Sequence, residues 1–295
     1  MNRTKILSTA VIFLSSTLTL ALPQSSSPSS NGPAIQTTPA PAGSPVAPPG
    51  TAAPARNSAV KSPQPKTQAE YDEFKAASSL NDPAKLEAAA TDFAQKFPDS
   101  ELRSFLFQQA MGEYQAANNT DKALEMARTV LKFEPYNPVA LLTAAQILAE
   151  RTRDTDLDSK DRLAEADSDA RIAILHAGDI AQPPNLTPEK FASAMAQLRG
   201  TAHEVIGNVA FKRLDYFSAV KEYNAAAAEE KEHTDAVVWL RLAVANDKSG
   251  DYSAATQAVI KAITASEPGS QLRQLAEKEQ SRLTKLSSTT TPASK

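Results

Sequence analysis

The sequence predicts an all-α protein, a superhelical solenoid of antiparallel helix pairs that ends in a C-terminal capping helix. Three observations predict this fold class. Aromatic residues make up only 6% of the 295 residues, and the chain after residue 66 is rich in Ala, Leu and Glu, which favour helices over sheets. No segment of that region alternates between apolar and polar residues as a strand does. Helical segments recur there at even intervals, and several share one internal spacing.

Charge is distributed unevenly along the chain. The first 66 residues contain five basic side chains and no Asp or Glu, whereas the remainder contains 26 basic and 34 acidic side chains, a net charge of −8. Because duplex nucleic acid requires a basic surface, we expect no nucleic-acid partner. The chain has no cysteine, which excludes disulfides, thiol nucleophiles and Cys-based zinc sites.

Residues 1–21 have the pattern of a secretory signal peptide. Arg3 and Lys5 supply positive charge, and residues 6–22 are apolar apart from Ser and Thr. Small residues precede a plausible cleavage site after Ala21, so we expect the mature protein to be periplasmic or secreted. The alternative is an uncleaved anchor that tethers the protein to a membrane, although a helix of this length spans only about 25 Å, slightly less than the hydrocarbon core.

Residues 22–66 are predicted to form a disordered linker rich in Pro, Ala and Ser. Eleven of the 20 prolines lie between residues 23 and 65, and large apolar residues are rare there. Such a segment cannot bury enough apolar surface to offset the entropy that ordering would cost. It is either a tether or an inert terminus of the mature chain. Residues 287–295 are predicted to be a short disordered tail of the same kind.

Residues 67–286 are predicted to form the helical repeat domain. Helix starts are marked by a capping residue followed by proline, as at Asp82-Pro83 and Thr187-Pro188. Pro268-Gly269-Ser270 ends one helix and begins the last one. The predicted helices span residues 67–80, 83–97, 100–117, 120–133, 138–152, 160–177, 187–213, 215–231, 235–248, 251–266 and 270–285.

A repeated residue pattern is clearest in the copy at about 236–269. Trp239 precedes the pair Leu242-Ala243, an Asp-Tyr corner follows, and Pro268 closes the unit. Two further copies lie at about 104–137 and 200–233. From the small or slim residue of the first helix to an alanine of the second, the spacing is 12 residues in all three copies. These residue pairs are Met111 and Ala123, Gly207 and Ala219, and Ala243 and Ala255.

This pattern resembles the tetratricopeptide repeat family, whose unit of 34 residues places aromatic residues, a Leu-Gly pair, alanine and proline at fixed positions. The resemblance covers most of residues 67–269. It departs from the family pattern at Asn246 and Val259, which stand where aromatic residues are usual. The resemblance implies stacked helix pairs and a scaffold or adaptor of the cell envelope whose partner is a protein or peptide.

Helix packing explains the residue types of the pattern. Small residues such as Gly207 and Ala219 allow the two helices of a pair to approach closely, and Trp239 and Tyr252 are expected to fill the spaces that remain. The last helix is amphipathic, as expected of a helix that caps the open end of a solenoid.

The sequence offers no recognisable catalytic or cofactor site. His176, His203 and His233 lie roughly 30 residues apart and lack the spacing of metal ligands. His203 falls where the repeat places a core residue, so we expect it to pack in the interior. No nucleophile elbow, phosphate-binding loop or dinucleotide motif is present. We therefore expect a non-catalytic protein without metal or cofactor, with an enzyme of unrecognised site as a remaining alternative.

One acidic stretch suggests a second alternative, a calcium-responsive module. Asp154, Asp156, Asp158 and Glu165 have the spacing of the acidic ligands in an EF-hand loop, but Ser159 replaces the glycine of its sharp turn. The other interpretation is that this stretch is an exposed insertion between two repeat helices, and that its acids lie near the N-terminus of the second helix.

Four polar residues are predicted to face the concave side of the solenoid. Asn208 and Lys212 follow the glycine of one first helix, and Arg241 and Lys248 flank the corresponding alanine of the next. Such side chains can bind an extended peptide through its main chain or its carboxylates. Glu204 occupies a nearby inner position, which weakens a purely cationic groove. The alternative is that these are ordinary solvated charges.

Overall fold

The computed structural model describes residues 63–183 and 185–290, and the described part contains eleven α-helices, two short 3₁₀ helices and no strand. The all-α prediction is therefore confirmed. Residues 1–62, which include the predicted signal peptide and most of the predicted linker, lie outside the described residues. Within the described ranges, no helix combines the length and the apolar character needed to cross a membrane.

The helices follow the predicted bounds closely. They are α1 Gln68–Ser78, α2 Pro83–Lys96, α3 Leu102–Ala116, α4 Thr120–Phe133, α5 Pro138–Arg151, α6 Ser159–His176, α7 Pro188–Lys212, α8 Tyr216–Glu230, α9 Ala236–Ser249, α10 Tyr252–Ala265 and α11 Gln271–Thr290. The 3₁₀ helices η1 Ala177–Asp179 and η2 Lys231–His233 follow α6 and α8. The last helix extends to Thr290, beyond the predicted end of the repeat domain.

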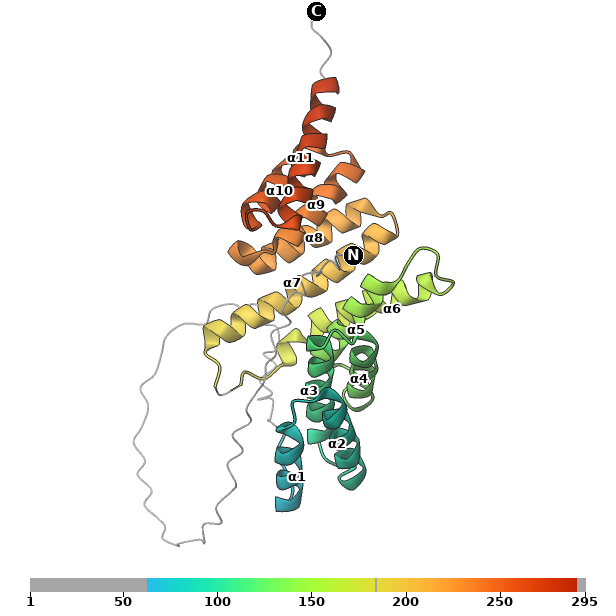
Figure 1. Ribbon diagram of the computed structural model, residues 1–295, viewed down its shortest axis with the longest axis vertical. Coiled ribbons are helices and arrows are strands. Elements are labelled where there is room, and N and C mark those ends of the chain that lie inside the picture. Colours follow the sequence, from blue (N-terminus) through green and yellow to red (C-terminus); the bar gives the residue numbers. More distant parts are fainter. Residues whose placement is uncertain (1–62, 184, 291–295) are drawn as a thin grey trace, which may run out of the picture.

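The helices form an extended stack in which each helix packs on its neighbours in the chain (Figure 1). The pairs are α1 with α2, α3 with α4, α5 with α6, α7 with α8, and α9 with α10. The stack runs from α1 at one end to α11 at the other, and α11 packs mainly on α10. The solenoid and its C-terminal capping helix are thus confirmed. The longest helix, α7, has 25 residues and also contacts α5. It therefore joins the helices that precede it in the stack to those that follow it.

Local capping explains why the helices start where they do. The side chain of Asp82 accepts a hydrogen bond from the Lys85 backbone N–H at 2.9 Å, and Pro83 follows as the first helical residue. Asn137 and Thr187 act in the same way before Pro138 and Pro188. In each case the cap satisfies a backbone donor that the first helical turn leaves unpaired, so the helix start is encoded in a few adjacent residues.

The small residues of the repeat lie in the core, as predicted. Ala219, Ala243 and Ala255 are fully buried. The ring of Tyr223 on α8 lies so close to Gly207 on α7 that a Cβ atom built at Gly207 would be only 2.7 Å from the Tyr223 ring. Helix α7 and helix α8 therefore pack at a distance that only glycine permits at this position.

Two aromatic residues depart from the expected packing. Trp239 is only partly buried, and the ammonium group of Lys261 lies 4.3 Å from the centre of its ring. Tyr252 is 46% exposed. The core of this repeat is instead formed by smaller residues, among them Ala243, Ala255 and Val259, and Trp239 packs against its edge.

Candidate protein-binding surface

Helices α5, α7 and α9 are the first helices of three successive pairs, and α7 and α9 carry all four residues of the predicted groove. Three of these residues, Asn208, Lys212 and Arg241, make hydrogen bonds or ion pairs within the fold. The fourth, Lys248, has an exposed side chain, and within the described residues it forms no ion pair. The structure therefore gives each of the four residues a distinct environment.

Lys212 closes the C-terminal end of α5. Its Nζ atom donates hydrogen bonds to the backbone carbonyl oxygens of Ala149 and Thr152, each at 2.6 Å. A cation at this point satisfies carbonyl groups that the last helical turn leaves unpaired and interacts favourably with the negative end of the helix dipole. Burial lowers the pKa of Lys212, and the carboxylates of Asp154 and Glu150 oppose that shift.

Arg241 on α9 forms an ion pair with Glu204 on α7. The Glu204 carboxylate is mostly buried, and burial raises its pKa while the positive charge of Arg241 acts in the opposite direction. Removing one partner would leave a partly desolvated charge without compensation, so the pair fixes α7 against α9. Glu204 is thus the counterion that neutralises one of the predicted groove cations.

Charges of alternating sign run across these three helices. Glu150 on α5 is exposed, and its charge influences the pKa values of both Lys212 and Glu204. Lys212 and Glu204 belong to α7, and Arg241 belongs to α9. We call these four residues the charged row. Positive and negative side chains alternate along this row.

The other two predicted residues lie on the same two helices, α7 and α9. The side-chain oxygen of Asn208 accepts a hydrogen bond from the hydroxyl group of Tyr223 at 2.8 Å, which ties α7 to α8. Lys248 lies near the end of α9 and has an exposed side chain. The side-chain oxygen of Asn208 is therefore already hydrogen-bonded within the α7–α8 pair, whereas the side chain of Lys248 is exposed and available to a ligand.

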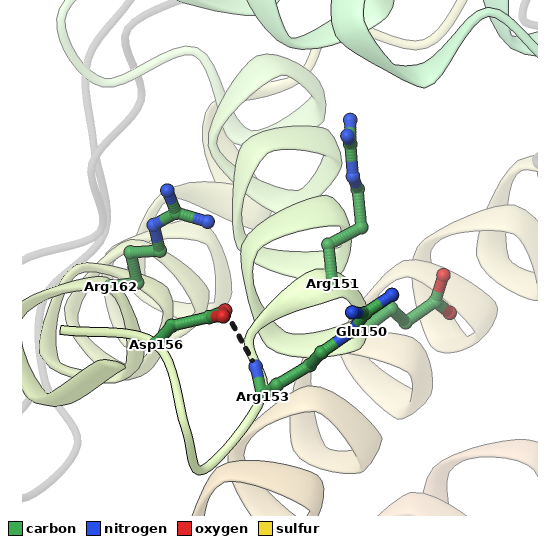
Figure 2. A pocket seen from close by; sticks show the side chains of 5 residues that line it. All are labelled: Glu150, Arg151, Arg153, Asp156 and Arg162. Atoms are coloured by element: carbon green, nitrogen blue, oxygen red, sulfur yellow. Dashed lines mark hydrogen bonds between the residues drawn. The ribbon is translucent and has the colours of Figure 1, made fainter. Parts of the chain in front are cut away.

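A pocket of about 350 Å³ lies at the C-terminal end of α5, next to the charged row. Its lining residues are Glu150, Arg151, Arg153, Asp156 and Arg162. Figure 2 shows that these side chains do not converge on one point, since Arg151 extends away from Arg153 and Arg162 extends from the other side of the pocket. The arrangement is an open, charged hollow that suits surface contact rather than the enclosure of a small substrate.

A second hollow of about 360 Å³ lies between α4, α5 and α6 and is lined by ion pairs. Arg128 pairs with Glu165 at 2.9 Å, Arg162 pairs with Asp158 at 2.7 Å, and Arg151 pairs with Asp121. The Arg128–Glu165 pair links α4 to α6 and the Arg151–Asp121 pair links α4 to α5, so most of the charges in this hollow are already neutralised.

The acidic stretch does not form a calcium loop. Helix α6 already begins at Ser159, and Asp158 and Glu165 are paired with arginines. Asp156 accepts a hydrogen bond from the Arg153 backbone N–H at 2.9 Å and stabilises the turn after α5. In the described residues no three His, Asp or Glu side chains are placed so that they could hold a metal ion.

His203 is half-buried, and its interaction is polar. Its Nδ1 atom lies 2.8 Å from a carboxylate oxygen of Glu222 on α8. The hydrogen bond with His203 lowers the pKa of Glu222. The prediction that His203 packs in the interior is thus correct in position, but the repeat pattern did not indicate its carboxylate partner, because that partner lies on the following helix.

The corners that join the first and second helices share an unusual backbone conformation. Asn118, Leu214 and Gly250 stand seven residues after Met111, Gly207 and Ala243, and all three have positive φ angles, of 56°, 62° and 89°. Asparagine and glycine adopt this left-handed conformation readily, whereas leucine does so at a cost of about 1 kcal/mol.

The Leu214 side chain gains little packing from this conformation, because it is 70% exposed. Phe217, three residues later, is 78% exposed, and Leu157 in the turn between α5 and α6 is fully exposed. Sequence reasoning missed these three residues. The signal for Leu214 was present in the repeat, since leucine stands at the position of Asn118 and Gly250.

Comparison with known proteins gives only distant structural matches. No family model matches the sequence, and no curated protein is significantly similar to it. Among solved structures, a thermophilic tetratricopeptide protein from Thermus thermophilus is 15% identical, with a TM-score of 0.42 over 71% of this chain and 98% of that protein. A tetratricopeptide repeat protein from Parabacteroides merdae is also 15% identical, with a TM-score of 0.35 over 77% of this chain and 95% of that protein. Both belong to the family that the repeat pattern resembles.

Proposed function

We propose that the protein is an exported, non-catalytic scaffold that binds a protein or peptide on the surface of α5, α7 and α9. The observation that supports this function is the charged row, which crosses three successive first helices, with the exposed Lys248 about two turns beyond Arg241 on α9. The exposed Glu150 and Lys248 lie on these rigid helices, and such a surface suits recognition of a chain that carries side chains of both signs. The open hollow that Glu150 helps to line adjoins the same surface and is also exposed.

Export is part of the proposal. Residues 1–21 support it through their charged start and apolar stretch, with cleavage after about Ala21. The proline-rich residues 22–66 then act as a tether that separates the stack from its point of attachment or from its neighbours. N-terminal sequencing of the protein from its source organism checks this part, and a cytoplasmic protein that retains Met1 contradicts it.

The binding surface is tested with two charges that the fold does not use. Residues 22–295 serve as bait for proteins of the source cell envelope, and the identified ligand is then titrated with the double variant Glu150→Gln/Lys248→Gln. We expect affinity to fall about tenfold, or 1.4 kcal/mol, while the melting temperature stays the same. Lys278→Gln, on the capping helix, is the matched control and should bind normally. Unchanged affinity in the double variant would place the binding site elsewhere.

A further inference from the structure

An exposed aromatic ring lies at the corner between α4 and α5. Tyr136 is 62% exposed, and its ring stacks on that of His176 at the end of α6, with the ring centres 4.7 Å apart and the planes 11° from parallel. Since His176 covers one face of the tyrosine ring, the exposed area lies on the other face and the edges of that ring. We call Tyr136 and His176 the aromatic shelf.

Both rings of the shelf are held in place. The Asn137 N–H donates to the Glu134 carbonyl oxygen at 3.0 Å, which closes a turn, and Pro135 stands at the second position of this turn, where proline is favoured. On the other side, the Nδ1 atom of His176 lies 2.7 Å from a carboxylate oxygen of Asp179. A ligand would therefore not have to order the two rings, which lowers the entropic cost of binding.

The N-terminal segment joins the described structure at a fixed point. The Lys66 backbone N–H donates to one carboxylate oxygen of Glu70 at 2.6 Å, and the buried Ser100 hydroxyl group donates to the other at 2.5 Å. The Lys66 ammonium group donates to the Asp99 carbonyl oxygen at 2.7 Å. Residues 22–62 are therefore connected to the stack directly beside the start of α3.

A short series of contacts leads from this point to the shelf. The Nε atom of Arg103 donates to the Ser100 carbonyl oxygen at 2.7 Å, and the Arg103 guanidinium lies 4.6 Å from the centre of the Phe133 ring. Tyr136 follows Phe133 by three residues. The path from Lys66 to Tyr136 along these contacts is no longer than about 40 Å, so the shelf lies on the side of the stack where the N-terminal segment joins it.

The N-terminal segment has the composition of a ligand for exposed aromatic rings. Residues 39–49 include five prolines, at positions 39, 41, 45, 48 and 49. Proline-rich segments dock on aromatic side chains because their extended polyproline II conformation is largely preformed. Pro49 precedes Lys66 by 17 residues, which span about 50 Å at about 3.1 Å per residue and therefore reach the shelf. Because the shelf and the segment belong to one chain, docking also has the advantage of a high effective concentration over a separate proline-rich protein.

Charge does not select this ligand. Arg103 and Lys132 are close to the path described above, as are Glu134 and Asp179, so both signs are present along this edge. Residues 22–62 contain two basic side chains and no acidic one, opposite in sign to the net charge of −8 from residue 67 onward. Overall charge therefore does not oppose docking, and ring stacking provides the specificity.

We propose that residues 39–49 dock on the aromatic shelf of the same chain, with proline rings against the open face of Tyr136. The N-terminal segment then folds back along the stack, and only the residues before position 39 act as a free tether. Docking in this way sets how far the stack can extend from its N-terminal attachment.

The first test measures the distance between the segment and the shelf. The chain has no native cysteine, so spin labels can be attached selectively through Ser44→Cys and Lys132→Cys in the chain from residue 22 onward. Double electron–electron resonance should give a narrow distance distribution, and Tyr136→Ser should convert it to a broad one. Tyr252→Ser, at an exposed tyrosine of α10, is the matched control and should leave the distribution narrow. A broad distribution before any change at Tyr136 would overturn the proposal.

The second test changes the segment and leaves the helices intact. Replacement of Pro45, Pro48 and Pro49 by alanine should broaden the distribution as Tyr136→Ser does, whereas replacement of Pro23 and Pro28 by alanine should not. An unchanged distribution in the triple variant would reject docking of residues 39–49. A mixture of chains that each carry one label should give no defined distance, and a defined distance between chains would show that the segment docks on a second copy instead.

Discussion

The ring of Tyr223 covers the backbone of Gly207 at a distance that leaves no room for a methyl group. A Cβ atom at Gly207 would lie 2.7 Å from Tyr223 Cε1, and Tyr223 is itself only 1% exposed, so its ring cannot move aside. We expect Gly207→Ala to lower the free energy of unfolding by about 1–3 kcal/mol, the usual cost of overpacking a core. Urea denaturation measures the change. Gly178→Ala is the control, because nothing lies within 4 Å of its Cβ position, and an equal loss in both variants would contradict the packing argument.

Lys212→Met should destabilise the junction between α5 and α7. The variant keeps most of the apolar stem but leaves the carbonyl groups of Ala149 and Thr152 without their donor, at a cost of about 1–2 kcal/mol. Hydrogen exchange near the end of α5 should accelerate. Lys248→Met removes an equal charge from an exposed side chain and should change neither quantity. A Lys212 variant as stable as the native chain would mean that the contact contributes nothing.

Glu230 makes stability depend on pH near neutrality. Burial raises its pKa to about 7, so the native state binds a proton more tightly than the unfolded chain, whose glutamate titrates at about 4.5. Ionisation in the native state therefore lowers stability as the pH rises from about 5 to 8. We expect Glu230→Gln to stabilise the protein at pH 8 by about 1 kcal/mol, after allowance for solvent screening, and to change little at pH 5.

Unfolding curves at both pH values test this prediction. Glu229→Gln is a useful comparison, because Glu229 is the adjacent residue and pairs with Arg199 at 2.8 Å. Its loss should not stabilise the protein at pH 8. A Glu230 variant whose stability follows the same pH dependence as the native chain would show that another group is responsible.

Leu214→Gly should stabilise the protein. Glycine adopts the left-handed conformation without strain, and little packing is lost because the leucine side chain is mostly exposed, so the expected gain is about 1 kcal/mol. The reciprocal change at the equivalent corner, Gly250→Leu, should cost a similar amount. Thermal unfolding of the two variants gives both values. Destabilisation by Leu214→Gly would mean that the leucine contributes to the fold after all.

The helix starts could be predicted from sequence because they depend on neighbouring residues. Asp82 and Pro83 act within one turn, and the same holds for Asn137 and Thr187. The 12-residue spacing of the repeats similarly encodes the contact of the two helices within each pair.

The environment of the candidate site could not be predicted in the same way. Lys212 finds its acceptors about 60 residues earlier in the chain, and Arg241 finds Glu204 on another helix pair. These partners depend on the angle at which successive pairs stack, which no short sequence pattern specifies. Leu214 is intermediate: its backbone conformation follows from its position relative to Gly250, but the extent of its exposure depends on how α7 and α8 meet.

The packing of each helix on its neighbours in the chain also has a kinetic consequence. Contacts between sequence neighbours close short loops, so the stack has low contact order and should fold rapidly, with any pair able to serve as a nucleus. Helix α7 lies in the middle of the stack and contacts both α5 and α6 behind it and α8 ahead of it. It is therefore the element through which order formed in one part of the chain propagates to the other, and the ends of the stack should open first when the protein is mildly destabilised.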